Sequence, residues 1–139
     1  HVIADYRGDV RVNGKRFTSA SYSLTTKALE LKRGDLITVR VENIWGTKGF
    51  WLMWVADDKT RGFVTSSRGW MAYQPSNITE WWTVKPGTGP EVPAKAEPGI
   101  NNRFLAAIKD IPESRNNPGQ VLWHPNPNLK IVHFYFVVE

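Results

Sequence analysis

Residues 34–43, Gly34-Asp35-Leu36-Ile37-Thr38-Val39-Arg40-Val41-Glu42-Asn43, alternate apolar and polar side chains. The nearby residues 49–55, Gly49-Phe50-Trp51-Leu52-Met53-Trp54-Val55, are apolar on both faces. Alternation with period two predicts a strand with one buried and one solvent-facing side. Such a strand, joined by a short glycine-containing loop to an apolar strand, is typical of a sandwich. The sequence therefore predicts an all-β, antiparallel β-sandwich.

Shorter strand patterns flank this pair. Residues 9–12 alternate in the same way and lead into Asn13-Gly14, which tolerate positive φ and favour a tight hairpin turn. Residues 85–99 hold four prolines and three glycines and predict an irregular surface segment. Residues 102–111 fit either a short helix or a strand. Further strands are predicted over residues 63–65, 70–73, 80–84, 119–123 and 131–138.

Length and composition predict one domain over residues 1–139. A chain of 139 residues, 41% hydrophobic and 22% charged, can bury a substantial core and has an ordinary balance for a folded protein. No apolar run approaches the roughly 18 residues of a membrane span. The chain has no cysteine, which excludes disulfides and zinc–thiolate sites, so packing must supply its stability.

The charge balance favours a polyanionic partner. Lys and Arg number 18 against 13 Asp and Glu, a formal net charge of +5 at pH 7. Such a charge attracts sulfated or uronic-acid glycans, nucleic acid and acidic surfaces. The cations are dispersed from Arg7 to Lys130 without a block of five or six, which argues against nucleic acid. We therefore expect glycans, including anionic ones, as partners.

Short motifs follow one another in a fixed order along nearly the whole chain. They are Ala4-Asp5, Val12-Asn13-Gly14, residues 31–39, Asn43, Gly49-Phe50, Val64-Thr65-Ser66, Trp70, Trp81 or Trp82, and Trp123 before an aromatic last strand. This order resembles the galactose-binding-like family of jelly-roll sandwiches, although residues 85–99 and Phe134-Tyr135-Phe136 depart from its pattern. The family houses carbohydrate-binding modules, lectins and adhesion domains, often extracellular. The resemblance implies a jelly-roll fold and sugar binding.

Seven tryptophans are an excess for this length, and sugar binding uses a flat aromatic face beside polar groups. If residues 35–44 and 49–56 form a hairpin and residues 62–65 pair onward, the loops 44–48 and 66–69 meet at one end of the sandwich. The structural alternative places Trp54 and Trp70 in the core and Trp45 as a lid. The predicted ligand-binding residues are Trp45 and Trp70, supported by Asn43, Lys48, Ser66 and Arg68.

For two groups of apolar side chains, the sequence does not decide between a buried and an exposed position. Trp51 and Met53 share one face of the strand over residues 50–55, opposite the face that we expect in the core. An exposed second face would mark a binding or assembly surface, but we expect another segment, such as residues 85–99, to cover it. Trp81 and Trp82 pose the same question, because adjacent strand residues face opposite ways.

The histidines indicate a rival function. An N-terminal His1 can chelate copper through its amine and ring nitrogens, with His124 and His133 as the available partners. This arrangement resembles copper-dependent polysaccharide monooxygenases, which also use β-sandwich scaffolds. The alternative is that His1 results from processing, His124 lies in a proline-rich turn and His133 pairs with a strand neighbour.

Three further motifs carry chemistry of their own. Arg7-Gly8-Asp9 is an integrin-binding tripeptide when it lies at a loop tip, but here we expect it at a strand start, with its geometry fixed. Asn77-Ile78-Thr79 matches the N-glycosylation acceptor. Calcium prefers hard oxygen ligands. The carboxylates that could supply them, without regular spacing, are Asp5, Asp35, Asp57 and Asp58.

These observations favour a non-catalytic, extracellular carbohydrate-binding protein of lectin type. The sequence shows no nucleophile elbow and no pair of carboxylates placed across a cleft for glycoside cleavage. Two alternatives remain: a copper-dependent polysaccharide monooxygenase, and a structural protein that assembles by self-association without binding sugar.

Overall fold

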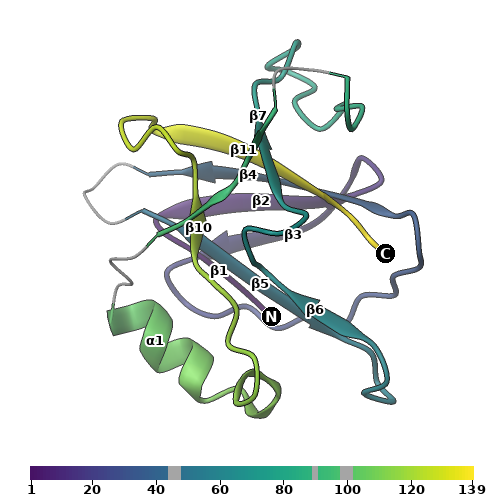
Figure 1. The fold of residues 1–139 in the computed structure, drawn as a ribbon, viewed down its shortest axis with the longest axis vertical. Helices are drawn as coiled ribbons and strands as arrows, with labels where there is room; N and C mark the ends of the chain where they lie inside the picture. Colours follow the sequence, from purple (N-terminus) through teal and green to yellow (C-terminus); the bar gives the residue numbers. More distant parts are fainter. Residues whose placement is uncertain (44–47, 89–90, 98–101) are drawn as a thin grey trace.

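The computed structural model describes residues 1–43, 48–88, 91–97 and 102–139. Two antiparallel sheets pack face to face, and a short helix lies against the outside of one of them (Figure 1). The predicted all-β antiparallel sandwich is confirmed. None of the described helices is long and apolar enough to span a membrane.

The first sheet has five strands and the second has six. The five-stranded sheet runs β1-β5-β10-β9, with β6 paired to the free end of β5; its strands are β1 (Val2–Ala4), β5 (Phe50–Val55), β6 (Gly62–Val64), β9 (Lys95–Ala96) and β10 (Leu122–Trp123). The six-stranded sheet runs β3-β2-β4-β11-β7-β8; its strands are β2 (Arg7–Val12), β3 (Lys15–Ser21), β4 (Leu36–Glu42), β7 (Met71–Tyr73), β8 (Val92–Pro93) and β11 (Ile131–Val137).

The alternation in β4 sets the two faces of the six-stranded sheet. Val39 and Val41 are fully buried between the sheets, whereas Arg40 and Glu42 face outward and are only partly buried. The strand is central, paired with β2 on one side and β11 on the other. The predicted half-buried strand is therefore confirmed, and its polar positions line the outer face.

An aromatic cluster fills the space between the sheets. Trp70 packs edge-on against Phe50, with ring centroids 5.1 Å apart, and stacks on Phe136 at 5.0 Å. Phe134 contacts both Phe50, at 5.2 Å, and Trp123, at 6.3 Å. Aromatic pairs of this kind contribute beyond the area that they bury. Much of the tryptophan excess thus serves the core.

The second apolar face of β5 is covered. Trp51 and Met53 pack with Phe104 and Ile108 of α1 (Asn102–Lys109) in a smaller cluster outside the five-stranded sheet. The expectation of a cover is confirmed, but the covering segment is α1 together with Ile111, the residue before the 3-10 turn η1 (Pro112–Ser114), and not residues 85–99. Of the helix and the strand that the sequence allowed for residues 102–111, the structure has the helix.

The hairpin turn is confirmed and one predicted strand is wrong. Asn13 and Gly14 connect β2 to β3 with φ values of 49° and 80°, as a tight turn between twisted strands requires. Residues 79–82 form a turn and residues 83 and 84 are irregular, so the strand predicted over residues 80–84 is not formed. Trp81 is buried there against His133, and Trp82 lies under the Arg11 guanidinium, 3.7 Å from the ring centroid. Packing on the outer sheet face, rather than pairing, orders this segment.

Candidate functional site

Asn43 and Lys48, which flank the first of the two loops predicted to meet, lie at the opposite end of the sandwich from residues 66–69. Asn43, before the first loop, donates its backbone NH to Lys130, just ahead of β11. Gly69, at the end of the second loop, lies against Phe136 near the other end of β11. Lys130 and Phe136 are separated by about 20 Å of extended chain, at roughly 3.3 Å per residue. The predicted convergence is wrong, because residues 66–69 return to the sheet at the far end of β11.

The residues of the predicted site are correspondingly dispersed. Trp70 is fully buried, so no sugar can stack on it. Asn43 is also buried, and Lys48 donates its ammonium proton to the Pro127 carbonyl. Ser66 and Arg68 share a local turn in which Ser66 Oγ accepts the Arg68 NH at 3.3 Å. Trp45 lies outside the described residues.

The three histidines of the copper hypothesis do not meet. His1 extends β1 in the five-stranded sheet, where its Nδ1 lies 2.8 Å from Thr26 Oγ1. His133 belongs to the outer face of the other sheet, and His124 lines the same pocket as His133. Among the described residues, no three His, Asp or Glu side chains lie close enough to hold one metal ion. The predicted copper arrangement is therefore not formed.

Two of the four candidate calcium ligands, Asp35 and Asp58, accept local hydrogen bonds. Asp35 accepts hydrogen bonds from Asn13 Nδ2 at 2.9 Å and from the Lys32 NH at 2.8 Å, and the Asn13 bond is the largest cause of its lowered pKa. Asp58 accepts from the NH and hydroxyl of Thr60. Asp57 is exposed on the same turn, whereas Asp5 is buried between β1 and β2.

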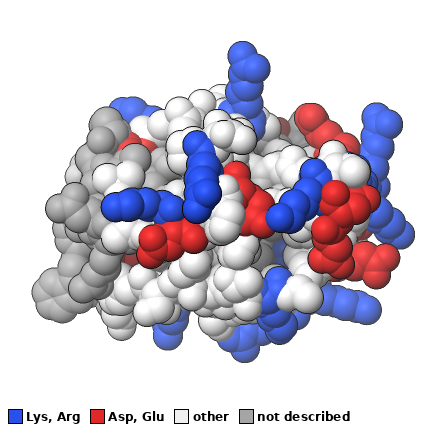
Figure 2. Space-filling view, turned by 90° about the horizontal axis from the view of Figure 1, so that it is seen from below, with Lys and Arg blue, Asp and Glu red and all other residues white. Residues whose placement is uncertain are grey.

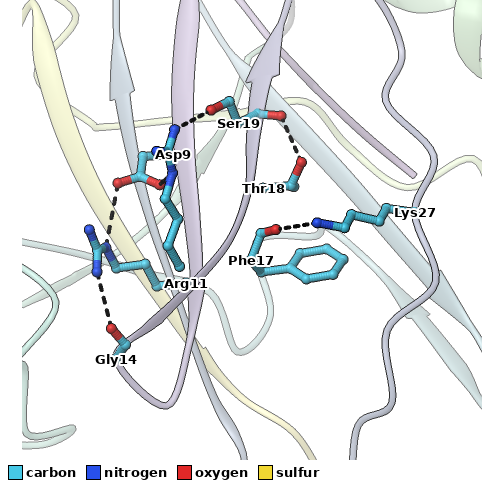
Figure 3. A network of polar contacts seen from close by, with 8 residues as sticks. Asp9, Arg11, Gly14, Phe17, Thr18, Ser19 and Lys27 are labelled. Atoms are coloured by element: carbon cyan, nitrogen blue, oxygen red, sulfur yellow. Dashed lines mark hydrogen bonds and ion pairs between the residues drawn. The ribbon is translucent and has the colours of Figure 1, made fainter.

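The two surface motifs differ in accessibility. Arg7-Gly8-Asp9 lies within β2, paired on both sides, where Asp9 forms ion pairs with Arg11 at 3.4 Å and Arg16 at 3.5 Å (Figure 3). Its fixed, paired geometry is as expected. Asn77 is exposed, and its Oδ1 accepts the Thr79 NH at 2.9 Å.

A different indole lies beside an open groove. Of the six described tryptophans, only Trp54 and Trp82 are not buried. Trp54 lies near the end of β5, in the part of the strand that pairs with β6 (Figure 1). It lines a groove of about 910 Å³ between residues 26–32 on one side and residues 53–61 on the other. This volume lies in the range of ordinary ligand sites.

The Trp54 ring is held in one orientation. Its Nε1 donates to the Leu29 carbonyl at 2.9 Å, which ties the indole to the opposite wall of the groove. Phe63, its cross-strand partner, stacks at 5.9 Å between ring centroids, and the Arg61 guanidinium carbon lies 5.7 Å from the Trp54 centroid. Trp54 therefore lines the groove with its ring already fixed, so the side chain has little conformational entropy to lose on binding.

Charged side chains line the rest of the groove. Lys27 donates to the Phe17 carbonyl at 2.9 Å and lies over the Phe17 ring, so its ammonium is positioned at the wall (Figure 3). Lys59 and Glu113 form an exposed ion pair at 3.8 Å. The complete set of charged residues in the lining is Lys27, Lys32, Lys59, Arg61, Glu30, Asp57 and Glu113. Four cations face three anions, and both kinds can hydrogen-bond hydroxyl groups.

Figure 2 shows one side of the molecule, on which Lys and Arg are interspersed with Asp and Glu. Mixed charge of this kind provides short-range hydrogen bonding and not one extended cationic stripe.

No protein-family model matches the chain, and no curated protein or solved structure is significantly similar to it.

The sequence interpretation missed Trp54 as a site residue because an indole inside an apolar strand is usually buried. One signal was present: Trp54 lies next to the end of its strand, directly before the charged turn at residues 57–61. Arg61 and Lys59 of that turn line the groove with it. A terminal strand position beside a charged turn indicates that the core ends there.

Proposed function

We propose that the protein binds carbohydrate in the groove beside Trp54. The half-buried, hydrogen-bonded indole carries this proposal, because a fixed aromatic surface can pack against the C–H face of a pyranose ring. The charged walls supply hydrogen-bond donors and acceptors for ring hydroxyls. Lys27 and Arg61 favour glycans that carry carboxylate or sulfate groups.

The order of motifs resembling the galactose-binding-like family supports the same class of function, and a jelly-roll arrangement of the two sheets is part of the proposal. An extracellular location follows from it, since glycans of this kind are displayed outside the cell. The groove takes the role that the loops 44–48 and 66–69 had in the sequence interpretation.

A glycan array at physiological salt tests the proposal, with neutral, uronic-acid and sulfated glycans displayed together. We expect binding by the wild-type chain and a loss of about tenfold or more in affinity for Trp54→Ala, as for truncation of a central aromatic contact. Trp82→Ala is the matched control, because Trp82 is also a half-buried indole but lies under Arg11 on the other sheet. Its binding should be unchanged.

Arg61→Ala tests the groove if Trp54→Ala does not fold, because Arg61 is exposed and its substitution leaves the core unchanged. We expect Arg61→Ala to weaken binding of anionic glycans more than binding of neutral ones. Binding that survives Trp54→Ala in a folded protein, or the absence of any bound glycan, contradicts the proposal.

A further inference from the structure

A second pocket opens on the outer side of the six-stranded sheet, near the start of β11. It has a volume of about 210 Å³ and shares no lining residue with the Trp54 groove. Residues from β4, β7 and β11 form its floor, and the segments after β7 and β10 form its walls. Its lining includes Arg40, Gln74, Ile78, His124, Ile131 and His133.

The most informative residue of this pocket is His133, which is only 8% exposed. Its ring lies between those of Tyr73 and Trp81, with centroids 5.7 and 5.5 Å away. Within the described part of the chain, His133 Nε2 is buried and has no hydrogen-bond partner. Leaving a buried polar atom unpaired is energetically costly. His133 is therefore a polar side chain of this pocket whose hydrogen bonding the described chain leaves incomplete.

The other polar groups of the pocket are mainly donors. The Nδ1 of His124 accepts the Asn126 NH at 2.8 Å, which places the proton of the neutral ring on Nε2. Glu42 bridges Arg7 at 2.6 Å and Arg40 at 2.8 Å, so this group of two cations and one anion carries one net positive charge. A donor-rich pocket beside a net cation favours an anionic ligand.

The rim of the pocket is apolar. Ile78 and Ile131 are 79% and 43% exposed, two of the few large hydrophobic side chains that the described surface leaves open. Leu129 and Pro75 line the same pocket. Exposed aliphatic side chains around a polar floor match a ligand with a compact hydrocarbon body.

We propose that this pocket binds a small organic carboxylate with an apolar body. The carboxylate hydrogen-bonds to His124 and His133 near the Arg40 guanidinium, and the hydrocarbon part packs against Ile78 and Ile131. This site is independent of sugar binding at Trp54.

Carboxylate binding in this pocket should depend on pH. Burial, and then the Arg40 charge from β4, lower the pKa of His133 to about 4, and burial also lowers the pKa of His124. Tyr73 from β7 and Tyr135 on β11 stay neutral, because burial raises the pKa of both phenols. A bound carboxylate raises the pKa of both imidazoles, so binding takes up protons and becomes tighter as the pH falls.

Calorimetry with cyclohexanecarboxylate and its neutral analogue cyclohexanecarboxamide tests the proposal on the full chain. We expect the carboxylate to bind about tenfold more tightly than the carboxamide. Its dissociation constant should fall roughly threefold between pH 7.5 and pH 5.5, while that of the carboxamide stays constant. Equal affinities, or no saturable binding of the carboxylate, overturn the proposal.

Three variants locate the site. His133→Gln and His124→Ala should each weaken carboxylate binding about tenfold or more and reduce its pH dependence. His124 is in a loop and only partly buried, so its variant serves if His133→Gln does not fold. Trp54→Ala should bind the carboxylate as the wild type does, which separates this site from the sugar groove. Carboxylate binding that His124→Ala leaves unchanged rejects the assignment.

Discussion

At the scale of single residues, a glycine allows two segments that are distant in the sequence to approach each other closely. Gly119 has a φ of 68°, and a Cβ at this position would lie 2.4 Å from Val64 Cγ2 and 2.7 Å from the Thr65 carbonyl oxygen. The neighbouring Gln120 NH donates to that same carbonyl at 2.7 Å. The close approach of this segment to the end of β6 therefore depends on glycine.

Gly119→Ala should lower the free energy of unfolding by about 3 kcal/mol, from backbone strain together with the overlap. Gly34→Ala is the matched control: Gly34 has a φ of 90°, but a Cβ added there would meet no atom within 4 Å. Gly34→Ala should lower the free energy of unfolding by only about 1 kcal/mol, from backbone strain. Urea denaturation measures the free energy of unfolding of both variants. Equal decreases would show that the overlap of the added Cβ with Val64 does not destabilise Gly119→Ala.

At the scale of elements, the short helix α1 closes the outer face of β5. One face of the helix is buried and the other is exposed: Phe104 and Ile108 pack against Trp51, whereas Leu105 is 48% exposed. Trp51 Nε1 also donates to the Pro118 carbonyl at 2.7 Å, so the chain after the helix is held to the same strand. A helix of eight residues is stable here because of this packing.

Phe104→Ala should therefore destabilise the protein by about 3–5 kcal/mol, the usual cost of removing a buried phenyl ring. The adjacent Leu105→Ala, on the solvent side, should change stability by less than about 0.5 kcal/mol. Thermal unfolding of the two variants provides the comparison. Similar melting temperatures would mean that α1 does not cover the face of β5.

At the scale of the whole molecule, the described surface exposes large hydrophobic side chains at only a few positions. They are Ile78, Val92, Leu105, Ile131 and Val137. Apart from Ile78 and Ile131, which share the rim of one small pocket, they lie on different elements. Stable protein interfaces bury roughly 800 Å² on each partner, usually around an apolar centre.

This surface predicts a monomer in solution. Analytical ultracentrifugation without sugar should give the mass of one chain at high protein concentration. The net charge of +5 at neutral pH also opposes association. Stable oligomers under these conditions would instead favour the alternative of a structural protein that assembles by self-association.

The strands over residues 36–42, 50–55 and 131–137, and the turn at Asn13-Gly14, could be predicted from the sequence. Alternation and positive φ are local properties of the chain. The strand predicted over residues 80–84 is wrong because the contacts that order it come from another part of the chain: Trp81 packs against His133. Local propensity carries no information about such a partner.

Sequence alone thus determined the class of fold and which faces of its main strands are apolar, because both follow from periodicity within a strand. Only the tertiary structure decided which indole borders a groove, Trp54 instead of Trp70, and that His124 and His133 share a pocket. These outcomes depend on which strands become neighbours and where each connection crosses the sandwich. Both are settled by long-range packing between segments that no local pattern relates.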